Sequence, residues 1–469
     1  MTIRRDRYLQ RIIARKHNGL VKVITGIRRC GKSYLLFNLF RRHLEAEGVD
    51  GGHIIGVDLE DKEYALLRNP NRLFDYIMER IPCDGKWTYV FIDEIQMCRK
   101  VLMDGVRRKD VLPEDVADSY ITFYDILNSL RKKPNVDVYV TGSNSKLLSK
   151  DVATNFRDRG VEIKLHPLSF AEYFEFSDLS DKSEALSNYM IWGGMPMAVM
   201  DSDDASRAEY LKSLFGKVYL KDIVERNRLK SVELCELVLN ALCSSVGSLT
   251  NPNKLCKTLG SEAHIATTTR TLAKHLDYFT DAFLFEKAER YDVRGKKHLA
   301  FPRKYYAEDV GLRNARLNFR ENDEAHLMEN VLFNELVSRG YSVDVGVVDV
   351  LDRNRSGKVV RKRYEIDFVV NAGFNKVYVQ SAYSLESKGK VGQERNPLIK
   401  SGDFFSKIIV EWGYGLLRPD DDGIFHVGII PFLLDESILS GIIAEAKFSP
   451  RKMAALSGSH SSLTRMPLT

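Results

Sequence analysis

Residues 26–33 read Gly-Ile-Arg-Arg-Cys-Gly-Lys-Ser, which places two glycines around a short loop and a lysine and a serine directly after it. Such a loop can turn its backbone N–H groups inward, where they bind phosphate oxygens. Lys32 would then reach the outer phosphates of a nucleotide, and Ser33 would hold Mg²⁺. A glycine-rich turn without a ligand is the alternative. The residues expected to contact the nucleotide are Gly26, Ile27, Arg28, Arg29, Cys30, Gly31, Lys32, Ser33 and Tyr34.

Two further segments end in polar residues after an apolar run. Residues 89–94, Tyr-Val-Phe-Ile-Asp-Glu, end in Asp93, which could hold Mg²⁺ through water, and Glu94, which could polarise an attacking water. Residues 138–144, Val-Tyr-Val-Thr-Gly-Ser-Asn, end in Ser143 and Asn144, which could bond to a terminal phosphate or to that water. Surface acids at a strand end and a capped turn are the respective alternatives.

The residues around these motifs alternate between strand-like and helix-like patterns. We expect strands at 20–25, 53–59, 87–92, 136–141 and 161–165, and helices at 33–44, 71–81 and 120–131. Strands that alternate with helices predict a parallel sheet covered on both faces. The fold class of this part of the chain is therefore α/β.

The composition is that of an ordinary globular protein, with 469 residues, 44% hydrophobic and 29% charged residues and a formal net charge of +6. Collagen-like, low-complexity and wholly disordered chains are excluded. The six cysteines form no CxxC pair and no zinc-like cluster, which favours a reducing compartment. The N-terminus is too charged for a signal peptide, and no apolar run of about 18 residues occurs. We therefore expect a cytoplasmic protein without a membrane partner.

The positive charge is concentrated in two segments. Residues 1–50 contain 12 Lys/Arg against 4 Asp/Glu, and residues 351–400 contain 11 against 5. The second segment includes a basic run that could grip phosphates, although a charged hairpin tip is the ordinary alternative. This run consists of Arg353, Arg355, Lys358, Arg361, Lys362 and Arg363.

The order of the glycine loop, the VFIDE strand and the TGSN strand resembles the core of an AAA-type P-loop ATPase. Later segments resemble one prokaryotic family of these ATPases, over residues 167–170, 193–196, 219–226 and 304–313. The resemblance extends from residue 21 to about residue 435. It implies ATP and Mg²⁺ as cofactors, and a core followed by a winged-helix-like segment and a C-terminal domain of uncharacterised function.

The resemblance also implies an arginine between the TGSN strand and the last core strand, presented to the γ-phosphate of a neighbouring subunit. Arg157 and Arg159 lie in that interval. Such an arginine stabilises the charge of the transition state, and it would make the protein a homo-oligomer. Surface pairing with Asp158 or Glu162 is the alternative.

We expect five segments along the chain. They are an ATPase core (1–167), a helical lid or linker (168–230), a winged-helix-like domain (231–318), a restriction-endonuclease-like α/β domain (319–445) and a disordered tail (446–469). In the third segment, 264–275 is the candidate recognition helix, with Arg270 and Lys274 one turn apart. Residues 231–300 contain nine basic and eight acidic residues, little charge for DNA, so protein docking is the alternative.

The C-terminal domain resembles the restriction-endonuclease-like nuclease fold in Glu329 on a helix, Asp367 on a strand and Gln380 on the neighbouring strand. That chemistry uses acidic oxygens to hold Mg²⁺ and a lysine to orient the attacking water. The lysine position is occupied by Ala382, so we expect a degenerate site. Lys376, on the same strand, would substitute only if its side chain reached the acids.

These features predict a Mg²⁺-dependent, ATP-hydrolysing AAA-type ATPase. Its nucleotide state would control C-terminal modules that engage nucleic acid, either DNA or RNA, or a protein partner. The first alternative is an ATP-regulated, metal-dependent nuclease. The second is a switch or scaffold that binds ATP with negligible hydrolysis.

Overall fold

The computed structural model describes residues 2–104, 106, 119–143, 159–262, 267–321, 323–353, 358–373, 375–384 and 388–447. Of the predicted features, Asn144, Arg157, Arg355, the start of the candidate recognition helix (264–266) and the tail from residue 448 lie outside the described residues. The chain divides into two compact units. The first comprises Met1–Pro167 and Tyr278–Leu284, and the second comprises Leu168–Asp277 and Phe285–Thr469.

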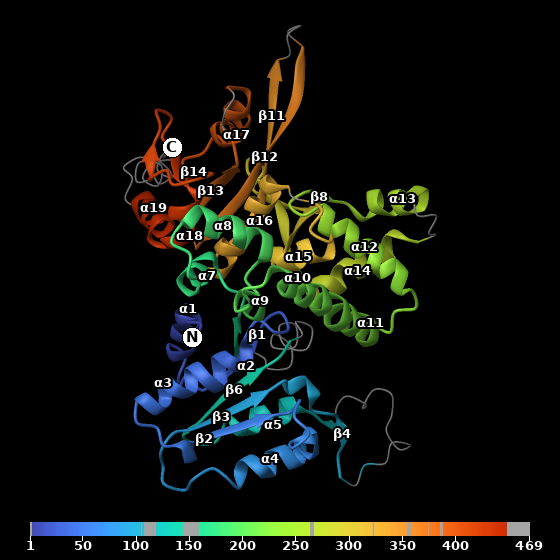
Figure 1. Ribbon diagram of the computed structural model, residues 1–469, viewed down its shortest axis with the longest axis vertical. Helices are drawn as coiled ribbons and strands as arrows, with labels where there is room; N and C mark the ends of the chain where they lie inside the picture. The colour runs from blue at the N-terminus through green and yellow to red at the C-terminus, as the bar shows by residue number, and fades with distance from the viewer. Residues whose placement is uncertain are drawn as a thin grey trace, which may run out of the picture. The chain divides into compact units, whose positions relative to one another are not determined.

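The first unit is built on a five-stranded parallel sheet with the order β2-β3-β6-β1-β7 (Figure 1). Its strands are β1 (Val21–Thr25), β2 (Ile54–Asp58), β3 (Thr88–Asp93), β6 (Val136–Thr141) and β7 (Gly160–Lys164). Every residue of β1, β3 and β6 is buried, as in parallel sheets that helices cover on both faces. The predicted α/β class with a parallel sheet is confirmed.

The helices of this unit follow the predicted alternation. They are α1 (Asp6–Ile13), α2 (Lys32–Tyr34), the π-helical η1 (Leu35–Phe40), α3 (Arg41–Ala46), α4 (Pro70–Met78) and α5 (Phe123–Leu130). The helix predicted over 120–131 begins later, because Tyr120 and Ile121 pair with β4 (Val101–Leu102) as the short strand β5. Thr122 then starts α5, since its N–H and hydroxyl both donate to the carboxylate of Asp125 (2.8 Å each).

Different helices cover the two faces of the sheet. Val90 and Ile92 of β3 belong to a buried cluster with Ile77 of α4 and Leu127 of α5. Phe91 points to the opposite face, where its ring lies 5.7 Å from that of Phe40 in η1. The alternation along β3 therefore fixes which residues face which layer, and each fully buried apolar side chain contributes about 1.5–3 kcal/mol.

The second unit contains a mixed sheet of nine strands with the order β15-β16-β14-β13-β12-β11-β9-β10-β8. The strands are β8 (Leu249–Thr250), β9 (Phe285–Asp292), β10 (Lys297–Ala307), β11 (Ser342–Arg353), β12 (Val359–Ala372), β13 (Asn375–Ala382), β14 (Ser406–Glu411), β15 (Arg418–Pro419) and β16 (Phe425–Gly428). β9 and β10 form an antiparallel hairpin. Because β9 also pairs with β11, strands from both sides of the predicted boundary at residue 318 share this sheet. The boundary itself stays a prediction.

Helices precede and cover this sheet. They are α7 (Phe170–Phe176), α8 (Lys182–Trp192), α9 (Pro196–Val199), α10 (Asp204–Ser213), the π-helical η7 (Leu214–Leu220), α11 (Lys221–Asn227), α12 (Val232–Ser244), α13 (Pro252–Glu262), α14 (Thr269–Asp281), α15 (Val310–Arg316), α16 (Glu324–Ser338), α17 (Lys388–Lys400), α18 (Ile429–Leu434) and α19 (Ser437–Lys447). The segment 193–196 separates two helices, because α8 ends before Gly193, which has a φ of 73°, and α9 starts at Pro196. In α16, Leu332 and Phe333 are buried with Phe368 of β12 in the largest core.

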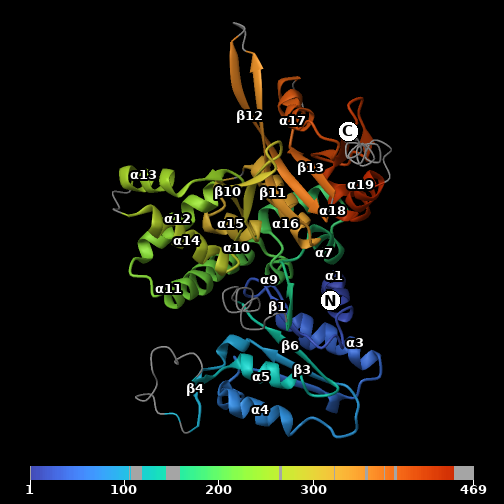
Figure 2. The same ribbon diagram turned by 180° about the vertical axis from the view of Figure 1, so that it is seen from behind.

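The outer halves of β11 and β12 form a two-stranded extension, the ribbon, which comprises residues 348–353 and 359–364. These residues pair with one another. Among the described residues, β11 pairs with β9 only as far as Val347, and β12 pairs with β13 only from Phe368 onward. In both views the ribbon extends past the neighbouring strands of its sheet (Figures 1 and 2).

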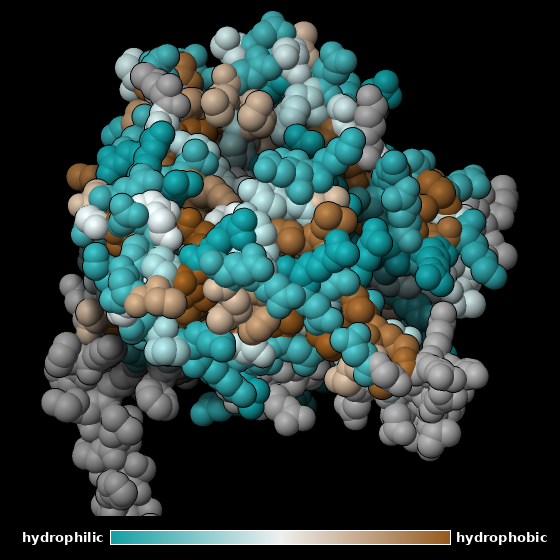
Figure 3. Space-filling view, turned by 90° about the horizontal axis from the view of Figure 1, so that it is seen from below, coloured by the Kyte–Doolittle hydropathy of each residue, from teal (hydrophilic) through white to brown (hydrophobic). Residues whose placement is uncertain are grey.

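Figure 3 shows one face as mostly hydrophilic, with hydrophobic residues scattered in small groups. All six cysteines are free thiols, and four of them are buried. Among the described helices, none is both long enough and apolar enough to span a membrane.

Candidate functional site

The glycine loop lies between the end of β1 at Thr25 and the start of α2 at Lys32, as the sequence predicts. Gly26 has a φ of 140°, and a Cβ on it would lie 2.1 Å from the carbonyl oxygen of Leu165. Gly31 has a φ of 98° directly before the helix. Both backbone conformations require glycine, so the two glycines of the motif determine the path of the loop.

Lys32 is buried and its Nζ turns back over the loop, where it donates to the carbonyl oxygens of Gly26 (3.1 Å) and Ile27 (3.0 Å). Not every residue of the loop is free to contact a ligand. The Cys30 N–H donates to the Ile27 oxygen (3.3 Å), and its buried side chain packs inside the unit. Arg28 pairs with Glu60 (2.5 Å).

Residues outside the loop form hydrogen bonds at its two ends. The Arg5 guanidinium is buried and donates to the carbonyl oxygens of His166 (2.6 Å) and Cys30 (3.5 Å). Leu165 N–H donates to the Thr25 oxygen at the end of β1 (2.8 Å). The loop is therefore anchored at both ends to the residues that follow β7, by a backbone hydrogen bond at Thr25 and through the Arg5 side chain at Cys30.

The two acids after β3 lie beside this loop, because β6 is inserted between β1 and β3 and all three strands end at the same edge. Asp93 is buried and accepts hydrogen bonds from the hydroxyls of Ser33 and Thr141. The same Thr141 oxygen accepts the N–H of Glu94 (3.0 Å). One threonine thus connects both acids, and the sequence analysis gave it no role.

Glu94 adopts a left-handed conformation, with φ 49° and ψ 51°. Its carboxylate lies 3.3 Å from the hydroxyl of Ser143 and accepts from the amide of Gln96. Burial raises the pKa of Glu94, and the charge of Lys32 opposes that rise. Burial likewise raises the pKa of Asp93, against the hydrogen bonds from its two hydroxyl partners. Raised carboxyl pKa values are typical of groups that accept a proton in catalysis.

Arg159 lies at the other end of the sheet from the loop. β7 pairs in parallel with β1, so Gly160 is opposite Val21 and Lys164 is opposite Thr25. At about 3.3 Å per residue, the five steps from Arg159 to Lys164 span about 16 Å. Arg159 is therefore too far away to contact a phosphate in the loop of its own chain, and its action on a neighbouring subunit stays a prediction.

The three residues predicted for a nuclease-like site come together in the second unit. Asp367 accepts the N–H of Ser381 (2.9 Å), and its own N–H donates to the Gln380 side chain (3.4 Å). Glu329 of α16 is buried close by. Lys376 does not reach them, because its ammonium lies over the ring of Tyr291 (3.7 Å from the centroid).

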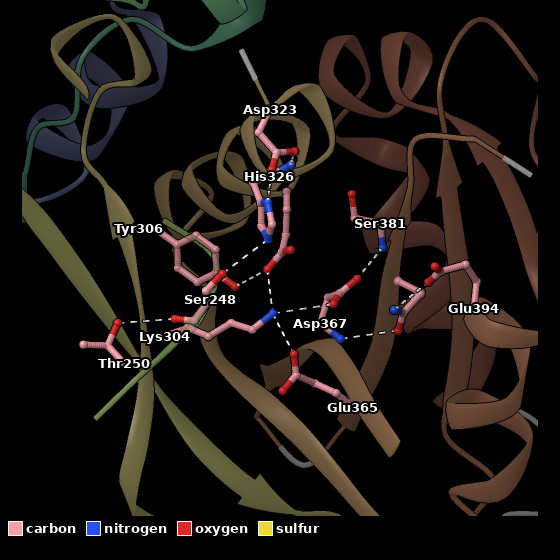
Figure 4. Close-up of polar contacts among 12 residues, drawn as sticks. Ser248, Thr250, Lys304, Tyr306, Asp323, His326, Glu365, Asp367, Ser381 and Glu394 are labelled. Atoms are coloured by element: carbon pink, nitrogen blue, oxygen red, sulfur yellow. Dashed lines mark hydrogen bonds and ion pairs between the residues drawn. The ribbon is translucent and has the colours of Figure 1, made fainter. Parts of the chain in front are cut away.

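A different lysine occupies this cluster. Lys304 of β10 is buried, and its Nζ lies 2.9 Å from Glu329, 2.8 Å from Glu365 and 3.8 Å from Asp367 (Figure 4). Tyr306, two residues along the same face of β10, donates its hydroxyl to Glu329 (2.6 Å). Burial lowers the pKa of Lys304, but the surrounding carboxylates raise it overall.

Several carboxyl groups surround the one ammonium group of Lys304. Burial raises the pKa of Asp367 well above its usual range, and the charge of Glu329 adds to this. Burial also raises the pKa of Glu394 in α17, which accepts a hydrogen bond from the Gln380 amide (2.8 Å). Lys304 begins one of the segments that resemble the ATPase family, but its residue type and spacing alone do not indicate this role.

Comparison with known proteins identifies the family. Residues 18–174 match the family model described as an AAA domain, and residues 183–323 match a domain of unknown function, DUF8612. An uncharacterized protein of Haemophilus influenzae is 33% identical over 436 residues, which cover 92% of this chain and 98% of that protein. The chain belongs to the AAA-type P-loop ATPase family. The glycine loop of this AAA-type protein is its P-loop, as the resemblance of the three motifs predicted.

Further relatives of this AAA-type protein are more distant. An uncharacterized protein of Methanocaldococcus jannaschii is 25% identical over 383 residues, covering 79% of this chain and 76% of that protein. The structure of a Walker-type ATPase of Pyrococcus abyssi has 15% identity and a TM-score of 0.43, covering 67% of this chain and 96% of that one. The Orc1 protein of Aeropyrum pernix in complex with DNA has 12% identity and a TM-score of 0.27, covering 68% and 93%. Both TM-scores are too low to transfer a function.

Proposed function

We propose that this chain hydrolyses ATP in a Mg²⁺-dependent reaction at the P-loop. The observation that carries the proposal is the hydrogen-bonded connection of Ser33, Asp93, Thr141 and Glu94 at one edge of the sheet, directly beside Lys32. Residues from three separate segments supply the phosphate, metal and water functions that phosphoryl transfer requires.

The residues around the loop fit a magnesium nucleotide. Ser33 and Asp93 are the residues that would hold Mg²⁺, because their oxygens are the donors that this ion prefers. The Asp93 carboxylate is buried and accepts hydrogen bonds from the Ser33 and Thr141 hydroxyls, so a bound Mg²⁺ would balance its charge. When bound, the metal would neutralise charge on the phosphates. The N–H groups of the loop and Lys32 would bind the phosphates themselves.

Glu94 is proposed to take the proton of the attacking water. Ser143, whose hydroxyl is 3.3 Å from the Glu94 carboxylate, would orient that water. The side-chain amide oxygen of Gln96 is also buried here, and within the described residues it has no hydrogen-bond partner. The role of Asn144 remains a prediction from the sequence.

A substitution of Glu94 tests the assignment. Glu94→Gln keeps the size of the side chain and removes the base, so the turnover number for ATP should fall by about 10²-fold or more while ATP affinity is retained. Glu45→Gln makes the same chemical change on the exposed surface and should leave turnover unchanged. Undiminished turnover in Glu94→Gln would exclude this residue as the base, and binding without turnover in the wild type would favour the switch or scaffold.

We further propose that the second unit engages nucleic acid through the ribbon. Residues 349–363 contain six basic and two acidic residues. Arg361 and Arg363 share one partner, Asp349, at 2.6 and 2.9 Å, and their side chains are 66% and 55% exposed. A two-stranded ribbon has the dimensions that a major groove admits, and excess positive charge favours a polyanion.

The winged-helix-like segment is the competing contact surface. Its elements follow the order α12, β8, α13, α14, β9, β10, with β8 paired to β10, which supports that interpretation. Arg270 and Lys274 at the start of α14 are both exposed. Binding of DNA and RNA should therefore be compared for two double variants, Arg361→Ala with Arg363→Ala and Arg270→Ala with Lys274→Ala.

The salt dependence of binding separates these surfaces. If the ribbon contacts phosphates, its double variant should reduce the slope of log affinity against log salt by about 0.9 for each lost contact, and the α14 variant should not. The opposite result would favour the winged-helix-like segment. Salt-independent, weak binding in the wild type would favour a protein partner.

A further inference from the structure

The acidic cluster of the second unit contains its own cation. Lys304 comes from the β9–β10 hairpin, whereas the acids come from α16 and β12, which follow it in the chain. The ammonium contacts Glu329 and Glu365 directly and lies 3.8 Å from Asp367. Figure 4 shows the Lys304 nitrogen between the carboxylates of Glu365 and Asp367. The position that these acids surround is therefore filled by a protein group.

The carboxylates are arranged around the ammonium rather than around a common vacant point. Among the residues that the structure describes, no three of Glu329, Glu365, Asp367 and Glu394 bring their oxygens within 4.8 Å of one another. Convergent oxygens at short range are what a magnesium or calcium ion requires. The acids thus have the geometry of a multiple ion pair with a lysine, not that of a divalent-cation site.

The other groups that would bind a metal in a nuclease-like site are hydrogen-bonded to protein partners. The Gln380 oxygen accepts the Asp367 N–H, and the Gln380 amide donates to Glu394. Gln380 is neutral, so it brings no charge to attract a metal. The second Asp367 oxygen is taken by the N–H of Ser381. The predicted metal ligands therefore do not fit Mg²⁺ as they stand.

We propose that the Lys304 ammonium takes the place of the divalent cation in this nuclease-like cluster, so that the domain holds its acids together without metal and does not cleave nucleic acid. A positive charge at this point repels an incoming metal ion and neutralises the acids that would attract it. Tyr306 supports the arrangement, since its buried hydroxyl donates to Glu329 and fixes that carboxylate toward β10. The inference is independent of ATP hydrolysis at the P-loop.

Manganese binding to the full, nucleotide-free chain tests the proposal, with free Mn²⁺ measured by electron paramagnetic resonance. Wild type and Asp367→Asn should bind the same number of ions. Lys304→Met, which removes the ammonium and keeps most of the volume, should gain one ion per chain. The double variant Lys304→Met with Asp367→Asn should lose that gain. Lys376→Met is the matched control and should bind as the wild type does, because its ammonium lies over Tyr291.

Two results would overturn the proposal. One is a wild-type protein that binds one more Mn²⁺ than Asp367→Asn, since the acids would then hold a metal beside Lys304. The other is a folded Lys304→Met protein that gains no ion. Where circular dichroism shows that Lys304→Met is unfolded, Lys304→Gln replaces it, and the comparison of wild type with Asp367→Asn is decisive in either case.

Nucleic-acid cleavage assays test independently whether this domain is a nuclease. Single- and double-stranded DNA and RNA are incubated with the wild-type protein in Mg²⁺ and in Mn²⁺, and no products are expected. Products that disappear in both Asp367→Asn and Lys304→Met would instead make Lys304 the lysine of an active nuclease. That outcome would overturn the proposal without affecting the ATPase assignment, which rests on Glu94.

Discussion

Replacing Thr141 by valine removes the one hydroxyl that serves both acids of the P-loop site. Thr141 is fully buried, donates to the Asp93 carboxylate and accepts the Glu94 N–H at 3.0 Å. Valine has nearly the same shape, so no cavity forms. The variant leaves a backbone donor without a partner and removes a hydrogen bond to an ionisable group, which together cost about 3 kcal/mol.

The matched control is Thr141→Ser, which keeps the hydroxyl and removes one methyl group. It should cost about 1 kcal/mol, the transfer free energy of that methyl group. The loss in Thr141→Val, about 3 kcal/mol relative to the wild type, therefore reports the hydroxyl, and the loss in Thr141→Ser reports the packing of the methyl group. Because the hydroxyl also orients Glu94, Thr141→Val should lower ATP turnover as well, whereas Thr141→Ser should largely retain it.

Tryptophan fluorescence can isolate the first unit for this measurement. The chain has three tryptophans, of which Trp87 lies in the first unit and stacks on His17 with ring centroids 3.9 Å apart. With Trp192→Phe and Trp412→Phe as the background, urea unfolding followed by Trp87 fluorescence reports the free energy of this unit. A Thr141→Val variant no less stable than Thr141→Ser would refute the linking role of the hydroxyl.

Two further substitutions test other parts of the structure. Gly26→Ala should weaken the binding of fluorescent ATP by about tenfold or more, because the new Cβ would lie 2.1 Å from the Leu165 oxygen at a φ of 140°, whereas Gly51→Ala, where a Cβ meets nothing within 4 Å and φ is not positive, should not. Asp309 is fully buried and accepts the N–H groups of Gly194 (2.7 Å) and Leu312 (2.9 Å), and burial raises its pKa from 3.8 to about 6. The folded state therefore keeps this proton after the unfolded state has lost it, so stability falls by up to about 3 kcal/mol as pH rises from about 4 through about 6. Urea unfolding of Asp309→Asn should lack that part of the pH dependence, and an unchanged slope would contradict the raised pKa.

The P-loop could be predicted from the sequence because its chemistry is local. Two glycines, a lysine and a serine at fixed spacing between a strand and a helix suffice to indicate it, and Asp93 and Glu94 follow a recognisable apolar strand. The function of Thr141 could not be predicted in the same way. It depends on β6 lying between β1 and β3, which is a property of strand order rather than of neighbouring residues.

In the second unit, too, residues of one local pattern could be grouped from the sequence, whereas a contact that depends on strand order could not be predicted. Glu329, Asp367 and Gln380 could be grouped from the sequence because they lie on a helix and two strands of one α/β segment, α16, β12 and β13, and their role as a site stays a prediction. Lys304 precedes those elements and reaches the acids through pairing of β9 with β11. Lys376 lies on the same strand and the same face as Gln380, but four residues, about 13 Å, separate the two along β13, and the Lys376 ammonium lies over the Tyr291 ring.

The pairing of β9 with β11 also determines how this protein can be divided for study. Val345–Val347 of β11 lie in register with Arg290–Asp292 of β9, in the interior of a nine-stranded sheet. A fragment cut at the predicted boundary of residue 318 would expose two open strand edges, each with unpaired backbone groups that can recruit another chain. We expect both halves to aggregate, and a fragment of residues 168–447 to be the smallest soluble piece that retains Lys304 among its acids.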